Sequence, residues 1–203
     1  MIRKLLPGAL IGALAIVAIA FASPAFAQSG GGCQLQGNAN FSPGLNSTSQ
    51  DFTYSFGGDL TGCQSTDTGA PTSGAVEAGK VLTDPSGEQF QEPAATGTGS
   101  CGSSTTNGTG IVTWSDGTQT VVEYSTTGAA AAVNLSGTVV PSVTLQAINP
   151  QPGQPTSKTV TTTRYAGASA LGALAFQPPD PTACAGAGVT TAGISGFIGL
   201  GSQ

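Results

Sequence analysis

The stretch Gly108–Tyr124, GTGIVTWSDGTQTVVEY, decides the fold class. Asp116-Gly117 is a dipeptide typical of tight turns whose central residues have positive φ, and β-branched or aromatic residues fill both flanks. The pattern predicts a β-hairpin with a two-residue type I′ turn, in which Ser115 pairs with Thr118. Both faces of this ribbon carry apolar side chains, and the stretch indicates an all-β protein.

Similar strand signals recur on both sides of the hairpin. Cys33–Phe41 and Asp51–Cys63 both show the period-two alternation of half-buried strands, and no segment has a sustained helical period. About ten short strands joined by turns predict an antiparallel two-sheet sandwich, with a closed β-barrel as the alternative. Pro141 and the Gly- and Thr-rich stretch 96–109 are typical of protected sheet edges, which favours the sandwich.

Residues 1–27 have the features of a secretory signal peptide. Two basic residues precede an apolar run over 5–22, and a small-x-small cleavage sequence ends at Ala27. An uncleaved anchor is the alternative, because the run approaches the roughly 20 residues that span a bilayer; the prolines and the cleavage sequence favour removal. We therefore expect one β-domain over 28–203, secreted or associated with the cell envelope, with no membrane span in the mature protein.

The charge of the mature chain excludes two classes of partner. Residues 28–203 contain three cations, Lys80, Lys158 and Arg164, against ten carboxylates, which gives a net charge of −7. Nucleic acids and anionic membranes both require a basic surface. Neither is an expected partner, and an extracellular partner or ligand of another class is expected instead.

The exported part contains four cysteines, Cys33, Cys63, Cys101 and Cys184. An even count in an oxidising compartment predicts two disulfides, for which three pairings exist. If the first two strands pair antiparallel so that Cys33 lies opposite Cys63, then Phe41 lies opposite Ser55, and the predicted pairing is Cys33–Cys63 with Cys101–Cys184. Disulfide-bonded cysteines serve neither thiol catalysis nor zinc binding.

Catalytic and metal-binding motifs are scarce. The chain has no histidine, which excludes Ser-His-Asp and Cys-His catalysis and histidine-bound metals. A pair of carboxylates remains the one hydrolytic option, and nothing in the sequence brings two together. Asp84, Glu88 and Glu92 form the only acidic cluster with useful spacing; a calcium loop is conceivable, but the spacing departs from known calcium motifs and favours a solvated loop. No catalytic residue, cofactor or metal site is predicted.

Two further residues have alternative interpretations. Trp114, the only tryptophan, either stacks on a sugar from an exposed hairpin tip or anchors the core, and the core is favoured. Arg164 is the only arginine after the signal and is expected to pair with an acid that the sequence does not identify.

Phrases such as TRYAG (163–167), LAFQPPDPTAC (174–184) and GAGVTTAG (186–193) resemble functionally uncharacterised secreted proteins of actinobacteria. The resemblance implies export and no particular activity. The acidic, disulfide-bonded character is also similar to the small immunoglobulin-like chromophore carriers of that group. We predict a secreted non-enzymatic β-domain that binds a cell-envelope or extracellular partner. The alternatives are a two-carboxylate glycoside hydrolase and a carrier of a small apolar ligand.

Overall fold

A computed structural model describes residues 30–201. The strands are β1 Gly31–Leu45, β2 Gln50–Ser65, β3 Gly74–Ala78, β4 Val81–Thr83, β5 Gln89–Gln91, β6 Ala95–Gly99, β7 Ser103–Trp114, β8 Gln119–Ala129, β9 Ala132–Val140, β10 Ser142–Ala147, β11 Ser157–Thr161, β12 Ser169–Gln177 and β13 Val189–Gly201. A 3-10 helix, η1, spans Pro181–Ala185. The all-β class is confirmed, and so are the two disulfides. The predicted signal peptide, 1–27, lies outside the described residues.

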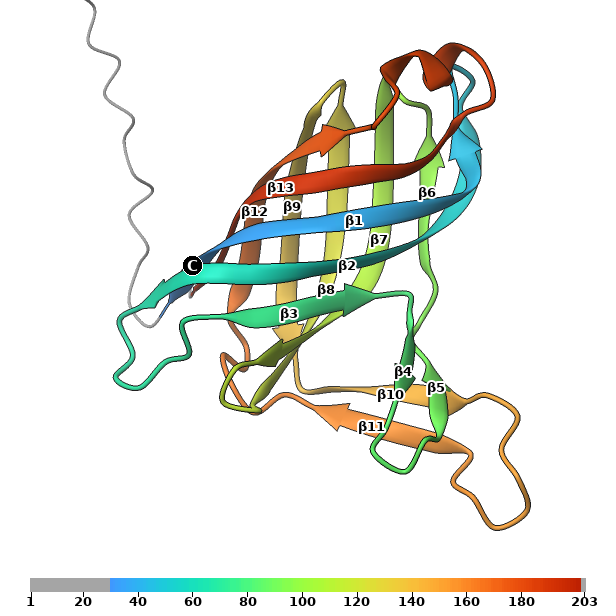
Figure 1. The fold of residues 1–203 in the computed structure, drawn as a ribbon. Coiled ribbons are helices and arrows are strands. Elements are labelled where there is room, and N and C mark those ends of the chain that lie inside the picture. Colours follow the sequence, from blue (N-terminus) through green and yellow to red (C-terminus); the bar gives the residue numbers. More distant parts are fainter. Residues whose placement is uncertain (1–29, 202–203) are drawn as a thin grey trace, which may run out of the picture.

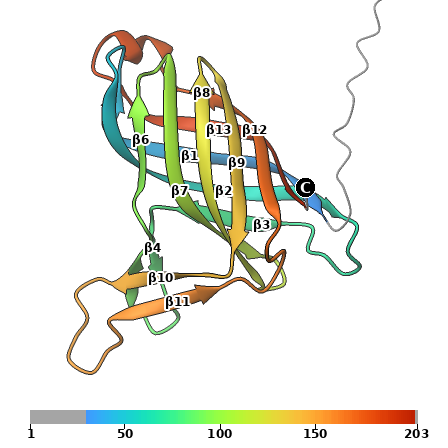
Figure 2. The ribbon, with the colours of Figure 1, turned by 180° about the vertical axis from the view of Figure 1, so that it is seen from behind.

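The large sheet closes into a barrel. Its strands follow one another in the order β1, β13, β12, β9, β8, β7, β3 and β2, and β2 pairs again with β1. Figures 1 and 2 show the barrel from opposite sides, with β13, β1 and β2 crossing the wall formed by β7, β8 and β9. Closure gives each of these strands a partner on both sides. The main sheet is thus the alternative architecture, the closed β-barrel, and not half of the sandwich that we favoured.

One position of the barrel wall is shared by two short strands. Between β2 and β7, β3 pairs with Phe56–Leu60 and β6 pairs with Gln50–Tyr54. The chain leaves the barrel after Ala78 and returns at Ala95. The stretch 96–109, interpreted as a sheet edge, therefore lies inside the closed sheet, because β6 is bonded on both sides.

The excursion between β3 and β6 supplies two strands of a second sheet, and the chain between β9 and β12 supplies the other two. Strands β4 and β5 pair with each other, and β5 continues to β10 and β11 in the order β11-β10-β5-β4. This sheet lies against the outside of the barrel near β7 and β8 (Figures 1 and 2). The buried apolar residues between them are Phe90, Ile111, Val121, Leu145 and Val160. Pro141 lies between β9 and β10, where the chain passes from the barrel to this sheet.

The disulfides link Cys33 to Cys63 and Cys101 to Cys184, as predicted. The register that led to the first bond is only partly right. Phe41 of β1 faces Tyr54 of β2 and not Ser55, because the pairing of the two strands shifts by one residue between Gly32 and Gln34. The bulge absorbs an extra residue of β2 beside the cysteines.

The central hairpin forms, but its predicted turn is wrong. Trp114 N–H donates to the carbonyl of Thr118, and Gly117 N–H donates to the carbonyl of Trp114, both at 2.9 Å. Gly117 has φ +80°, whereas Asp116 does not have positive φ. This is a three-residue loop, a type I turn followed by a left-handed glycine, in place of the two-residue type I′ turn. Opposite pairs shift by one, so Ile111 faces Val121.

Gly117→Val is expected to destabilise the protein by about 1–2 kcal/mol, because a β-branched residue is strained at this positive φ. An added Cβ would meet nothing within 4 Å, so the cost comes from the backbone and not from a clash. Urea denaturation measures the loss. Gly117→Asn is the matched control and should cost less, because asparagine tolerates the left-handed region. Equal midpoints for the Val variant and wild type would contradict the turn assignment.

Candidate functional site

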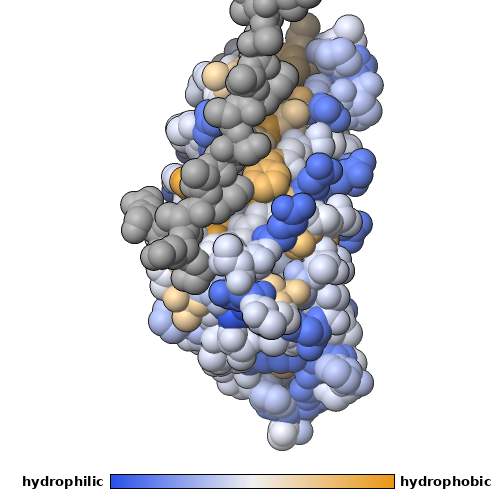
Figure 3. Space-filling model, turned by 90° about the vertical axis from the view of Figure 1, so that its left-hand side faces the viewer, coloured by the Kyte–Doolittle hydropathy of each residue, from blue (hydrophilic) through white to orange (hydrophobic). Residues whose placement is uncertain are grey.

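The barrel interior is an apolar core built from alternate residues of its strands. Outward positions on β1 are polar. Figure 3 shows one face of the molecule, on which hydrophilic and neutral residues surround small apolar areas. The buried interior residues are Cys33, Leu35, Ala39, Leu60, Val112, Trp114, Val122, Val139, Ala168, Ala170, Ile194 and Leu200. This pattern follows from the pleat, which directs successive side chains to opposite faces.

A cavity of about 150 Å³ lies among these side chains. None of the residues that line it carries a charge. The second disulfide, Cys101–Cys184, lies at the end of the barrel where η1 lies (Figure 1). Its cysteines pack against four buried residues, Leu45, Phe52, Val189 and Ala192. The cavity therefore lies within the barrel, mainly among side chains of its core.

Trp114 is fixed inside this cavity wall. Its Nε1–H donates to Thr120 Oγ1 at 2.9 Å, and the Thr120 hydroxyl donates to the carbonyl of Arg164 at 2.9 Å. The indole also meets the Tyr165 ring edge-on at 5.6 Å. Trp114 is 4% exposed, which confirms the core interpretation. Arg164 pairs with Asp116 at 2.8 Å, the acid that the sequence did not identify.

Four hydroxyl groups from three strands form a polar cluster in the cavity, which we call the hydroxyl corner. The Tyr54 hydroxyl lies 2.8 Å from that of Tyr124 and 3.1 Å from that of Thr106, which lies 2.8 Å from that of Thr126. All four residues line the cavity. Tyr124 reaches its place because it lies across from a glycine: a Cβ on Gly108 would sit 2.6 Å from the Tyr124 hydroxyl.

Burial keeps both tyrosines protonated. Loss of solvent raises the pKa of Tyr54, and it raises the pKa of Tyr124 well above its usual value, with the nearby Glu92 carboxyl acting in the same direction on Tyr124. At neutral pH the corner therefore offers neutral hydroxyls that donate and accept hydrogen bonds. It supplies neither a phenolate nucleophile nor a base.

Glu92 lies behind this corner, where the chain re-enters the barrel. It is 1% exposed, its Oε2 accepts a hydrogen bond from Lys80 N–H at 2.9 Å, and its own N–H donates to the carbonyl of Lys80. Its Oε1 has no partner among the described residues. Burial, followed by repulsion from the Glu77 carboxylate, raises the pKa of Glu92 to about 7.

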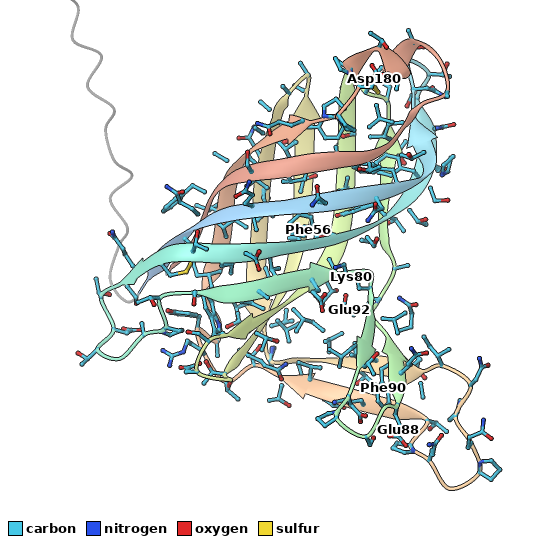
Figure 4. The ribbon with its side chains drawn as sticks, in the orientation of Figure 1. Phe56, Lys80, Glu88, Phe90, Glu92 and Asp180 are labelled. Atoms are coloured by element: carbon cyan, nitrogen blue, oxygen red, sulfur yellow. A yellow bond between two sulfur atoms is a disulfide. The ribbon has the colours of Figure 1, made fainter. Side chains whose placement is uncertain are left out.

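The acidic cluster predicted from the sequence does not converge. Figure 4 shows Glu92 beside Lys80 at the barrel, with Glu88 far from it beyond Phe90. Asp84 Oδ1 instead accepts hydrogen bonds from the N–H groups of Ser86 and Glu88 and closes a turn. Within residues 30–201, no three groups suited to a metal lie together. The geometry gives the calcium-loop alternative no support.

Sequence reasoning missed the hydroxyl corner. Tyr54 and Tyr124 are 70 residues apart in sequence. They come together because β6 and β7 pair side by side between β2 and β8, so that both tyrosines reach across the same part of the sheet. The one signal present is that each is an aromatic residue at an alternating position of a predicted strand, which identifies core residues in general and not a pair. The prediction of a solvated loop, made because the acidic spacing departs from calcium motifs, is wrong for Glu92, which is 1% exposed.

No family model, curated protein or solved structure matches the chain. Among residues 30–201, no helix is long and apolar enough to span a membrane.

Proposed function

We propose that this protein is an extracellular, non-enzymatic binding domain that takes up a small apolar molecule inside its barrel. One observation carries the proposal: an uncharged cavity of about 150 Å³ surrounded by apolar and aromatic side chains. An apolar engineered cavity of about this volume stays dry and binds benzene or xenon. The two disulfides are compatible with an extracellular location, which the signal-like segment 1–27 also favours.

The same geometry weighs against the glycoside hydrolase alternative. Such an enzyme needs two carboxyl groups on either side of an accessible sugar. Glu92 has the raised pKa of a general acid, but it is buried and does not line the cavity. Glu77, the acid that influences it, pairs with Lys80 at 3.3 Å. An apolar cavity without carboxylates suits binding better than hydrolysis.

Addition of toluene to the purified protein is expected to change the emission of Trp114 and to raise the melting temperature. Trp114 is the only tryptophan and lines the cavity, so its fluorescence reports on occupancy directly. At 100 times the dissociation constant, a ligand that binds only the folded state adds about 2.7 kcal/mol of stability. Native mass spectrometry of freshly secreted protein would detect a ligand already bound.

Two substitutions on β12 make a matched control. Ala170 lines the cavity and is 1% exposed, whereas Ala173 lies on the exposed outer face of the same strand. Ala170→Leu should fill part of the cavity and weaken toluene binding about tenfold, and Ala173→Leu should leave it unchanged. Absence of any toluene effect on wild-type emission and melting, with no bound mass, would overturn the proposed function.

A further inference from the structure

The hydroxyl corner has more donor hydrogens than it uses. Each hydroxyl carries one donor hydrogen and two acceptor lone pairs. The three contacts in the chain Tyr124, Tyr54, Thr106, Thr126 therefore use three of the four hydrogens. Among the described residues, no other acceptor is bonded to these hydroxyls. Whichever way the chain is oriented, one O–H group of the cavity lining has a hydrogen to spare.

We infer that the ligand of the proposed binding function carries a neutral acceptor oxygen that receives this hydrogen, as in a small phenol, alcohol or ketone. The inference rests on the proposed function and adds the chemical class of the ligand. The apolar part would lie against the side chains of the core, and the oxygen would lie at the four-hydroxyl corner. Without such an oxygen, or water in its place, the spare donor would be buried at a cost of about 1–3 kcal/mol.

The charges around the cavity explain why the oxygen is neutral. The lining contains no cation that would compensate a carboxylate or a phosphate. Lys80 pairs with Glu77, Arg164 pairs with Asp116, and Lys158 lies 4.0 Å from Asp84. Burying an unpaired charge costs far more than burying a hydrogen-bonded neutral oxygen. An anionic ligand is therefore disfavoured, and so is a cationic one, because no lining residue is acidic.

Phenol and toluene make a matched pair of probes, because a hydroxyl in one replaces a methyl in the other. Their affinities are measured by isothermal titration calorimetry on wild type and on a variant that removes all four hydroxyls. Its substitutions are Tyr54→Phe, Thr106→Val, Tyr124→Phe and Thr126→Val. All four nearly conserve shape, and replacing every partner of a network by apolar groups can be close to neutral for stability.

We expect the four-hydroxyl deletion to weaken phenol binding about tenfold and to leave toluene binding within about threefold. Tyr165→Phe, which removes a hydroxyl elsewhere in the cavity lining, is the control and should leave both affinities unchanged. If the combined variant does not fold, Tyr124→Phe and Thr126→Val, at the two ends of the chain, replace it, and at least one should weaken phenol selectively.

The outcomes separate the inference from the proposed function. A phenol-to-toluene affinity ratio that stays constant across these variants, with toluene still bound, overturns the inference and leaves the proposed function standing. Failure of both probes to bind wild type overturns the proposed function itself. Equal loss of phenol affinity in Tyr165→Phe would also contradict the inference, because the oxygen would then not be recognised at the corner.

Discussion

Removal of the Cys101–Cys184 disulfide by double substitution to alanine is expected to cost about 4.5 kcal/mol of unfolding free energy. The bond closes a loop with a sequence separation of 83 residues, and the chain-entropy model gives this value for a loop of that length. Both cysteines also pack against the buried cluster that contains Leu45 and Phe52 at one end of the barrel. Urea denaturation with a constant m-value measures the loss.

The Cys33–Cys63 pair provides the matched control. Its loop has a separation of 30 residues, for which the same model gives about 3.7 kcal/mol. These cysteines lie on β1 and β2, which are held together by hydrogen bonds along most of their length. The double alanine variant of this pair should therefore be the more stable of the two. The reverse order would show that loop length does not govern the contribution of either bond.

Local sequence patterns predicted the strands better than their registers. The alternation around Asp116-Gly117 correctly placed a hairpin, but the dipeptide is compatible with two turn geometries that differ by one residue in the loop. Which one forms depends on the sign of φ at Asp116, which the dipeptide does not fix; here φ at Asp116 is not positive, and Ile111 faces Val121. Cysteine pairing was predictable because it depends on strand adjacency, which tolerates the bulge near Gly32.

Closure of the barrel was not predictable from local patterns. It requires β1 to pair with β13, strands from opposite ends of the chain. The glycines and threonines of β6 were interpreted as a sheet edge. In the structure Gly97 instead allows the Phe52 ring to pack closely, because a Cβ on Gly97 would sit 2.4 Å from that ring. The hydroxyl corner was not predictable either, because Tyr54 and Tyr124 belong to strands that do not pair with each other and meet only through the order of the strands between them, β6 and β7.

The protein is expected to lose stability as the pH rises from about 5 to 8, because of Glu92. The carboxyl has a pKa of about 7 when folded, against an ordinary value of 4.5. The folded state therefore binds more protons than the unfolded state in this window, and unfolding free energy falls with pH until both forms are ionised. This difference in pKa corresponds to about 3 kcal/mol of unfolding free energy. The contribution is fully present below the pKa of the unfolded state and is lost above the pKa of the folded state.

The groups that face Glu92 fix the sign of this effect. Loss of solvent and, to a smaller extent, the Glu77 carboxylate oppose ionisation, while the backbone N–H and the ammonium of Lys80 favour it but do not cancel burial. Tyr124, on the barrel side, stays protonated throughout the window. Hydrogen bonds hold the pKa values of Asp84, Asp116 and Asp180 below their ordinary value of 3.8, so these groups act at lower pH and leave the window to Glu92.

Glu92→Gln isolates the titration, because the amide keeps an oxygen for Lys80 N–H and cannot ionise. Its unfolding free energy, measured by urea denaturation at pH 5, 6, 7 and 8, should stay nearly constant and should exceed that of wild type by up to about 3 kcal/mol at pH 8. Glu88→Gln, in the neighbouring turn, should keep the wild-type slope. A wild-type curve that is flat from pH 5 to 8, or one that rises with pH, would mean that Glu92, just before the chain re-enters the barrel at Ala95, does not titrate as a buried acid.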